Sequence, residues 1–341
     1  MSRPETIATS AIRKPSQLAV VTAFATICLI WGSTYLAIRY AVETLPPLLM
    51  MGVRHLTAGG LLYAWTRARG TAAPLRVHWK SAAITGAFLF LGSHGSLAWA
   101  ELHVPSGLAA LLSATLPLWI VVLTRMKRRG QPLSRSVITG LVLGFVGVGI
   151  LIGPAALHSG SSLNLLAVGM VLFGTLCWAS GTIYSQNAEL PSSTSLSSAM
   201  QMVSGGVILL LTGAVAGETN RMHLAAISAK SALSLAYLIL FGSLIAFTAF
   251  TWLHKHVSAT RNSTFAYVNP VVAVFLGWAF ASEVIGGRTI FATVAILASV
   301  ALVSLKPVGA TNDRKPEERV PAKMKCSSSE IESYRRQIES Y

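Results

Sequence analysis

The chain has 341 residues, of which 53% are hydrophobic and only 11% charged, and its mean hydropathy is +0.60. A soluble domain carries roughly 25% charged residues, so this composition excludes an ordinary soluble fold. The formal net charge of +15 would suit nucleic-acid binding in a soluble protein, but the Lys and Arg residues lie between long apolar stretches and in the tail. We therefore expect a membrane protein that has the lipid bilayer, and no nucleic acid, as its partner.

A transmembrane helix needs about 20 predominantly apolar residues to cross about 30 Å of hydrocarbon. Ten stretches approach that length, which predicts an all-α polytopic membrane protein with ten transmembrane helices. The predicted spans are residues 18–38, 47–66, 81–100, 105–124, 136–153, 163–185, 194–217, 231–253, 259–282 and 289–305.

The distribution of Lys and Arg predicts the orientation of the chain in the membrane. With ten spans both termini lie on one side, and most of the 27 Lys and Arg residues fall on that side. The connections on the other side contain Arg39, Arg221, Lys230 and Arg288. Because Lys and Arg accumulate in cytoplasmic loops, we expect both termini in the cytoplasm.

The second half of the chain repeats the first at nearly constant spacing. The matching residues are Trp31 with Trp178, Arg54 with Gln201, Gly59 with Gly206, Trp99 with Trp252, and Pro117 with Pro270. Each half contains five predicted spans, and an odd number inverts the second copy in the membrane. Inverted repeats are typical of secondary transporters, whose substrate site lies near the midplane between the repeats.

These boundaries give a predicted domain organisation with two repeats as its core. The ranges are 1–17 for a cytoplasmic N-terminal segment, 18–153 for repeat 1, 154–162 for a linker, 163–306 for repeat 2 and 307–341 for a cytoplasmic tail. The tail is rich in Pro, Ser, Lys and Glu and poor in apolar residues, so we expect it to be disordered.

Four local motifs resemble the EamA family of the drug/metabolite transporter superfamily, and within it the YedA-like inner-membrane permeases. They are Trp31-Gly32-Ser33-Thr34-Tyr35, Pro46-Pro47 followed by Arg54, Val104-Pro105-Ser106-Gly107 with Pro117, and Ala266-Tyr267-Val268-Asn269-Pro270 with Glu283. The resemblance implies two inverted five-helix repeats around a central cavity that opens alternately to each side of a bacterial inner membrane. It also implies export of metabolites, amino acids or drugs. The family often has Gly-Glu where this chain has Ser282-Glu283.

Arg54 is the most informative residue for function, because ionisable side chains inside spans usually face a cavity or a partner. Trp31 and His94 are predicted at the same depth, and Glu101 lies just above them at the mouth. On one interpretation Arg54 binds an anionic group of the substrate and Trp31 packs on the apolar part. On the other, Arg54 is a structural tie to Glu101 or to backbone carbonyls. His55 points about 100° away from Arg54 on the helix, and it is a coupling candidate together with Glu101.

The second repeat carries Trp178, Gln201 and Phe247 at the positions of Trp31, Arg54 and His94, so the two walls of the cavity are predicted to differ in polarity. Ser33, Tyr267 and Asn269 complete the cavity candidates through the motifs around them. Pro117 and Pro270 are predicted inside helices, where each removes a backbone donor and frees a carbonyl, which makes them gating or hinge candidates.

The sequence contains no phosphate-binding loop, no metal-ligand cluster and no nucleophile motif, so we expect neither a cofactor nor catalysis. Glycines from Gly140 to Gly153 are expected to pack within the bundle, which favours a monomer over a dimer. The predicted function is a secondary transporter that exports small molecules by alternating access. The alternatives are an importer of sugar-like or nucleotide-linked solutes, an integral-membrane enzyme, and a non-transporting scaffold.

Overall fold

The computed structural model describes residues 16–127, 135–152, 164–256 and 265–304. The predicted linker and tail, and the N-terminal segment before Ser16, lie outside these residues. Within the described ranges the chain is helical and contains no strand.

The first half forms helices that follow the predicted apolar stretches. They are α1 (Gln17–Ala41), α2 (Pro47–Ala68), α3 (Arg76–Gly86), the π-helix η1 (Ala87–Gly95), α4 (Ser96–Ala100), α5 (Ser106–Ser113), α6 (Leu116–Lys127) and α7 (Arg135–Ile152). Because α3, η1 and α4 are contiguous, they form one helical rod.

The second half follows the same order, with short extra helices in one connection. Its elements are α8 (Leu165–Ser185), α9 (Thr194–Val215), α10 (Glu218–Arg221), the 3-10 helix η3 (Leu224–Ala226), α11 (Ala229–Tyr237), the π-helix η4 (Leu238–Ile245), α12 (Ala246–His256), α14 (Phe265–Ala281) and α15 (Gly287–Ser304). The two π-helices occupy matching places in the two halves, and π-helical segments are frequent at functional sites.

Five helical stretches in the described residues are long and apolar enough to cross a membrane. They are Gln17–Ala41, Ser106–Thr124, Leu165–Ser185, Thr194–Val215 and Ala229–Phe250. Shorter apolar helices cover Ile138–Leu151, Val268–Ala281 and Gly287–Ser299. Each of the ten predicted ranges contains helix, but that all ten cross the membrane stays a prediction.

The predicted helix over residues 105–124 is interrupted, which corrects the expected position of Pro117. A turn at Ala114 and Thr115 separates α5 from α6, although Ala114 still donates to the carbonyl of Ala110, so Pro117 lies in the first turn of α6 and not in a helix interior. Proline is tolerated in a first turn, because the backbone N–H that it lacks would have no partner there. Pro270, by contrast, lies inside α14 as predicted.

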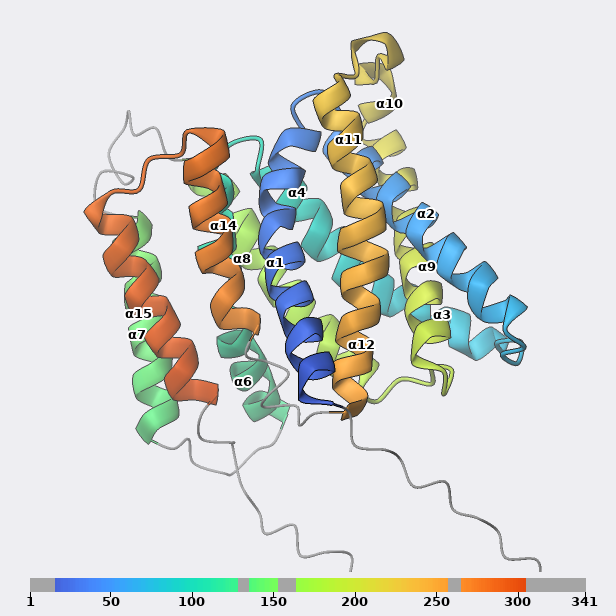
Figure 1. Ribbon diagram of the computed structural model, residues 1–341, viewed down its shortest axis with the longest axis horizontal. Coiled ribbons are helices and arrows are strands. Elements are labelled where there is room, and N and C mark those ends of the chain that lie inside the picture. Colours follow the sequence, from blue (N-terminus) through green and yellow to red (C-terminus); the bar gives the residue numbers. More distant parts are fainter. Residues whose placement is uncertain (1–15, 128–134, 153–163, 257–264, 305–341) are drawn as a thin grey trace, which may run out of the picture. The chain divides into compact units, whose positions relative to one another are not determined.

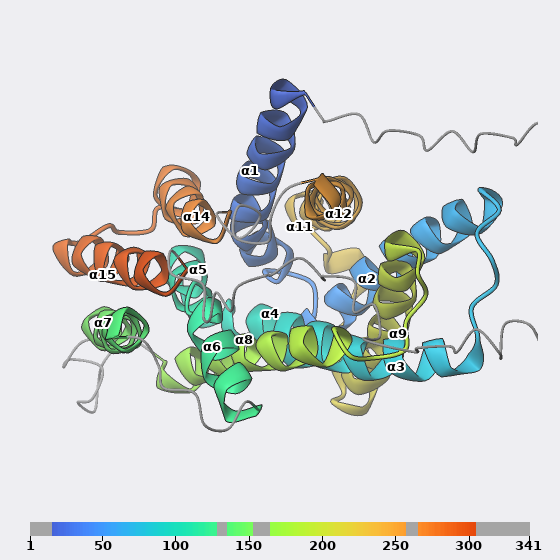
Figure 2. The same ribbon diagram turned by 90° about the horizontal axis from the view of Figure 1, so that it is seen from below.

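The first helix of each half packs against helices of the other half. Helix α1 contacts α11, α12 and α14 of the second half, whereas α8 contacts α3, η1, α4 and α6 of the first. The remaining helices pair as α2 with α9 and α7 with α15. In Figure 2 the α7 and α15 pair lies at one edge of the bundle, while the α2 and α9 pair lies on the opposite side of α1 and α8.

Glycines set the closest approach between α2 and α9. A Cβ added at Gly59 would lie 2.7 Å from Met202 Cβ, and one at Gly206 would lie 2.6 Å from the backbone nitrogen of Leu56. Real Cβ atoms do not approach other atoms this closely, so both crossings require glycine. The matched residues of the two repeats therefore meet at the same helix–helix contact.

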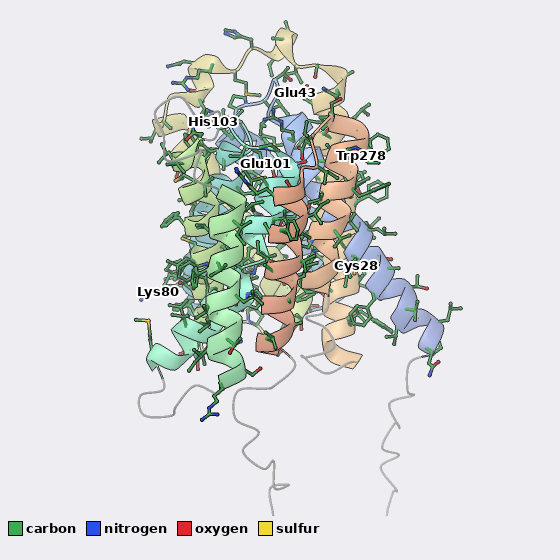
Figure 3. The ribbon with its side chains drawn as sticks, turned by 90° about the vertical axis from the view of Figure 1, so that its left-hand side faces the viewer. Cys28, Glu43, Lys80, Glu101, His103 and Trp278 are labelled. Carbon is green, nitrogen blue, oxygen red and sulfur yellow. The ribbon has the colours of Figure 1, made fainter. Side chains whose placement is uncertain are left out.

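The bundle has two distinguishable ends (Figure 3). We call them the Glu43 end, where Glu43, Glu101 and His103 lie, and the Lys80 end. Helix α1 runs toward the Glu43 end (Figure 1). Helix α8 runs the other way, because the chain after it enters α9, whose Leu196 and Met200 pack near Trp79, next to Lys80.

Hydrogen bonds at the Glu43 end connect the helix termini. The carboxylate of Glu218 accepts hydrogen bonds from the backbone nitrogens of Leu48 and Leu49 at 3.2 and 2.9 Å, which caps the start of α2. The carboxylate of Glu283 caps the start of α5 by accepting from the nitrogens of Ser106 and Gly107 at 2.6 and 2.9 Å. Negative charge is favourable at a helix N-terminus, so both contacts stabilise the closed arrangement of this end.

A left-handed residue precedes each of these two capping glutamates. Gly217 has φ 76° and Ser282 has φ 55°, in a region that favours glycine. The turn at Ser282 brings the backbone nitrogen of Glu283 to 3.1 Å from the carbonyl of Gly277. Serine at position 282 therefore occupies a conformation that favours glycine.

The outward surface of the bundle is rich in large apolar side chains. Phe173, Leu211, Phe275, Phe291 and Val294 are between 50% and 71% exposed. Exposed apolar surface on this scale is unusual for a soluble monomer and is expected where helices face lipid. The burial pattern agrees with the composition in placing these helices in a membrane.

Candidate functional site

A cavity of about 240 Å³ lies among helices of both halves. Its lining is mostly apolar and aromatic, with a few polar side chains. The lining residues are Trp31, Thr34, Tyr35, Ile38, Arg54, Ser93, His94, Leu97, Ser113, Leu116, Val171, Gly174, Thr175, Trp178, Phe247, Phe250, Phe265 and Asn269. An apolar pocket with a small number of placed polar groups is the usual form of a small-molecule site.

Arg54 reaches the cavity from the middle of α2 and is only 5% exposed. Its Nε donates to the hydroxyl of Ser243 in η4 at 3.0 Å, and Nη1 lies 3.8 Å from the sulfur of Met51. A guanidinium carries five N–H donors. Among the described residues these two contacts leave most of its donors available to a ligand in the cavity.

One interpretation of the sequence pairs Arg54 with Glu101 as a structural contact, but the described residues contain no ion pair between these two side chains. The structural partner of Arg54 is instead Ser243, from the other repeat. Gly242 beside Ser243 allows the approach, since an added Cβ there would lie 3.2 Å from Arg54 Nη2. Arg54 thus has one structural hydrogen bond across the repeats and also faces the cavity, so the two interpretations of this residue are compatible.

Trp31 forms part of an aromatic wall. Its Nε1 donates to the carbonyl of Gly242 at 3.1 Å, and its ring centroid lies 5.2 Å from those of Phe250 and Phe265. The hydrogen bond fixes the orientation of the indole, while the neighbouring rings offer apolar surface. Such a wall can pack against the apolar part of a ligand whose charged group meets Arg54.

His94 lines the cavity from η1 and is paired with His55. The Nδ1 of His94 lies 2.8 Å from Nε2 of His55, and the His94 ring lies tilted against that of Trp178 with centroids 5.1 Å apart. His55 is 1% exposed, packs against Phe90, and is not part of the cavity lining. The pair connects the cavity to a buried histidine on α2.

Asn269 adds a polar group from α14. Its Oδ1 is buried and has no hydrogen-bond partner among the described residues. Pro270, next to it, lacks the N–H that would bond the carbonyl of Ala266, so the helix also presents a freed acceptor at this level. These groups belong to α14, and Asn269 lines the cavity.

Several candidates from the sequence do not line the cavity. Ser33 lies 2.6 Å from the hydroxyl of Tyr237 and also donates to the carbonyl of Ile30. Gln201 donates to Ser197 within α9 at 3.0 Å. Glu101, expected at the mouth, is fully buried. The side chain of Tyr267 lies outside the described part of the chain.

Other lining residues were not singled out from the sequence. Tyr35 lies four residues after Trp31 and therefore on the same helix face, a signal that was available in the motif. Phe250, Phe265 and Thr175 carry no such signal, because aromatic and small polar residues occur throughout apolar helices. Ser243 could not be found either, since its role depends on contact with Arg54.

No group of three or more His, Cys, Asp or Glu side chains that could hold a metal ion occurs in the described ranges. Cys177 is buried and Cys28 half-buried, and both are free thiols. The cavity can recognise a ligand through the guanidinium of Arg54, the imidazole of His94, the amide of Asn269 and several aromatic rings.

The helices are apolar enough for a membrane, and the first helix of each half packs against the other half around the cavity. This arrangement defines a helical membrane protein of the transporter class. The sequence model of the EamA-like transporter family matches the chain twice, over residues 18–153 and 165–305. The chain belongs to this family, and the two matched ranges are its two repeats. The family is one of transporters.

Named relatives agree with this assignment. The chain is 36% identical to the uncharacterized inner membrane transporter YedA of Escherichia coli, over 82% of this chain and 91% of YedA. It is 25% identical to the uncharacterized transporter YoaV of Bacillus subtilis, over 74% of this chain and 85% of YoaV.

One solved structure, described as the crystal structure of a protein, is similar to this chain with a TM-score of 0.57. The two chains are 20% identical, and the match covers 85% of this chain and 98% of the other. This likeness concerns the fold alone.

Proposed function

We propose that this protein is a secondary transporter of the bacterial inner membrane that exports small metabolites carrying an anionic group and an apolar body. The observation that carries the proposal is Arg54, a buried cation that faces an aromatic-lined cavity between the two repeats. A buried charge is retained against a large desolvation cost, and inside a membrane it marks a substrate or ion pathway.

The cavity supports the size and chemistry of this substrate class. Its volume of about 240 Å³ is below the roughly 300–1,000 Å³ of pockets for drug-sized ligands. A guanidinium binds carboxylate or phosphate oxygens in a bidentate fork. Trp31 and Trp178 both offer flat apolar surface to the cavity.

The packing supports ten spans in two inverted repeats. Helices α1 and α8 begin the two repeats and run in opposite directions. Each packs against the third and fourth helical rods of the other repeat. The excess of Lys and Arg at the predicted inner side supports a cytoplasmic position for both termini.

Alternating access would require the contacts at the Glu43 end to break. Besides the two glutamate caps, Tyr40 donates to the carbonyl of Phe280 at 2.5 Å, and Lys230 pairs with Glu43 at 2.7 Å. Rocking of the repeats about the cavity, with flexing at Pro270 and at the break before α6, would open this end. Movement of a few helices around a fixed site is the usual mechanism of transporters with inverted repeats.

A binding screen followed by a flux assay tests the proposal. Purified protein is screened by thermal unfolding against amino acids, organic acids, sugars and nucleosides, and each anionic hit is compared with its uncharged amide, such as phenylacetate with phenylacetamide. A ligand at 100 times its Kd stabilises by about 2.7 kcal/mol. We expect the anionic member to raise the unfolding temperature of the wild type and its amide to have little effect.

Efflux of the radiolabelled hit from oriented proteoliposomes then measures transport. We expect Arg54→Ala to abolish efflux while the protein remains folded and inserted. Equal flux in wild type and Arg54→Ala would contradict the binding role of Arg54. Entry without exit would indicate an importer, and absence of flux under every gradient would indicate a scaffold.

A further inference from the structure

Glu101 is an acidic side chain that the proposed transport cycle does not yet use. It directly follows α4, is 0% exposed, and neither of its carboxylate oxygens has a hydrogen-bond partner among the described residues. An ionised carboxylate buried in this way would pay a large desolvation cost without compensation. The neutral acid does not carry that cost.

The charged groups around Glu101 are engaged elsewhere. The charges that act on it belong to Arg39, Arg54 and Glu283, from α1, α2 and the segment after α14. Arg39 donates to the backbone carbonyl of Glu101 and not to its carboxylate. Arg54 donates to Ser243, and Glu283 caps α5. The titratable Tyr35 on α1 also interacts electrostatically with this carboxyl group.

Glu101 lies next to the substrate cavity. Its backbone nitrogen donates at 2.9 Å to the carbonyl of Leu97, a cavity-lining residue one turn earlier. Tyr35, which interacts electrostatically with Glu101, also lines the cavity. The electrostatic interaction of Glu101 with Arg54 therefore links this carboxyl group to the residue that would bind the anionic group of a substrate.

We propose that Glu101 is a proton-binding site coupled to the substrate site through Arg54, an inference that rests on the proposed transport function. In the step that loads the site, a proton from water adds to one carboxylate oxygen and gives the neutral acid. In the step that unloads it, the same proton returns to water. No other group gains or loses electrons or atoms.

The coupling follows from the charge of Arg54. A free guanidinium favours the ionised form of Glu101, whereas an anion bound to Arg54 cancels that charge and favours the protonated form. By reciprocity, protonation of Glu101 strengthens anion binding by the same factor. The proton and the anionic substrate therefore bind together and cross the membrane in the same direction, which is outward when the outward gradient of the substrate exceeds the opposing gradient of the proton.

A metal cation fits this place less well than a proton. Two guanidinium groups act on Glu101 and would repel a cation. A metal ion also needs several ligands, and the described residues contain no group of three or more acidic, His or Cys side chains.

Infrared spectroscopy of the full-length protein in liposomes tests the proton site without any substrate. We expect the wild type at neutral pH to have a carbonyl stretch of a protonated carboxylic acid. This band should be lost in Glu101→Gln and retained in Glu43→Gln, because Glu43 is 40% exposed and paired with Lys230. Absence of the band in the wild type, or its survival in Glu101→Gln, would overturn the proposal. Glu101→Asp keeps a carboxyl group and should shift the band, which gives a second variant if Glu101→Gln does not fold.

The same band measures the coupling to Arg54. In Arg54→Gln the pH midpoint at which the band disappears should move to higher pH, whereas in Arg54→Lys it should stay close to the wild type. An unchanged midpoint in Arg54→Gln would overturn the coupling. Because these measurements need no flux, failure of the proposed transport function is detected separately, by the efflux assay.

Discussion

The two repeats carry different chemistry at matched positions, although they share one scaffold. Trp31 and Trp178 both line the cavity, and Gly59 and Gly206 both lie at the crossing of α2 and α9. Arg54, however, faces the cavity, while its counterpart Gln201 is absent from the cavity lining and bonds to Ser197 within its own helix.

The same difference occurs at the next matched pair. His94 of repeat 1 brings an imidazole to the cavity, and Phe247 of repeat 2 brings an apolar ring. The residues that both repeats retain are those that pack helices or form aromatic surface. The guanidinium and the imidazole come from repeat 1, whereas repeat 2 adds the neutral polar side chains of Thr175 and Asn269, so an asymmetric substrate would meet a cationic wall and a neutral wall.

The largest effect is expected when the shared scaffold is broken. Gly59→Ala and Gly206→Ala each place a Cβ against backbone or Cβ atoms of the facing helix, and such overpacking costs about 1–3 kcal/mol. The unfolding temperature of the purified protein measures this loss. Gly60→Ala is the matched control, because a Cβ there meets nothing within 4 Å.

Alanine is intrinsically better than glycine in a helix by about 1 kcal/mol. Gly60→Ala should therefore be neutral or stabilising. If Gly59→Ala and Gly60→Ala had the same unfolding temperature, the close crossing of α2 and α9 would be wrong.

A smaller effect is expected when the two walls of the cavity are made alike. His94→Phe gives repeat 1 the residue of repeat 2 and removes the hydrogen bond to buried His55, at a cost of about 1 kcal/mol. It should also weaken binding of an anionic ligand in the thermal screen, since the cavity becomes less polar. His103→Phe is the control, because His103 is exposed.

Exposed substitutions usually change stability by about 0.5 kcal/mol or less. If His103→Phe destabilised the protein as much as His94→Phe, the His55–His94 pair would have no special contribution.

The smallest effect is expected when only the charge of a helix cap is removed, a change that tests how the repeats differ at their helix termini. Glutamates of repeat 2 cap α2 and α5 of repeat 1, whereas α9 of repeat 2 is capped by its own Ser193. Glu283→Gln keeps an oxygen acceptor and removes the charge, so we expect a loss of about 0.5 kcal/mol. Thermal unfolding measures this change.

Glu283→Ala also removes the hydrogen bonds to α5 and should destabilise by about 1–2 kcal/mol. Equal stability of Glu283→Gln and wild type at low salt would indicate that the charge of this cap contributes nothing.

The sequence by itself determined the helical elements, because the length of an apolar stretch is a local property that lipid selects directly. It also determined the two EamA repeats, since Trp, Gly and Pro recurring in order are rarely coincidental. Arg54 was recognisable as a candidate for the same reason, as a charge inside a span needs no structure to be noticed.

Only the tertiary structure decided the partners of these residues. It placed Ser243 against Arg54 and turned Ser33 toward Tyr237. It also buried Glu101 without a hydrogen-bond partner in the described part of the chain. Which face of a helix meets which neighbour depends on the packing of residues far apart in sequence, and apolar helices carry almost no periodic signal that would orient them in advance.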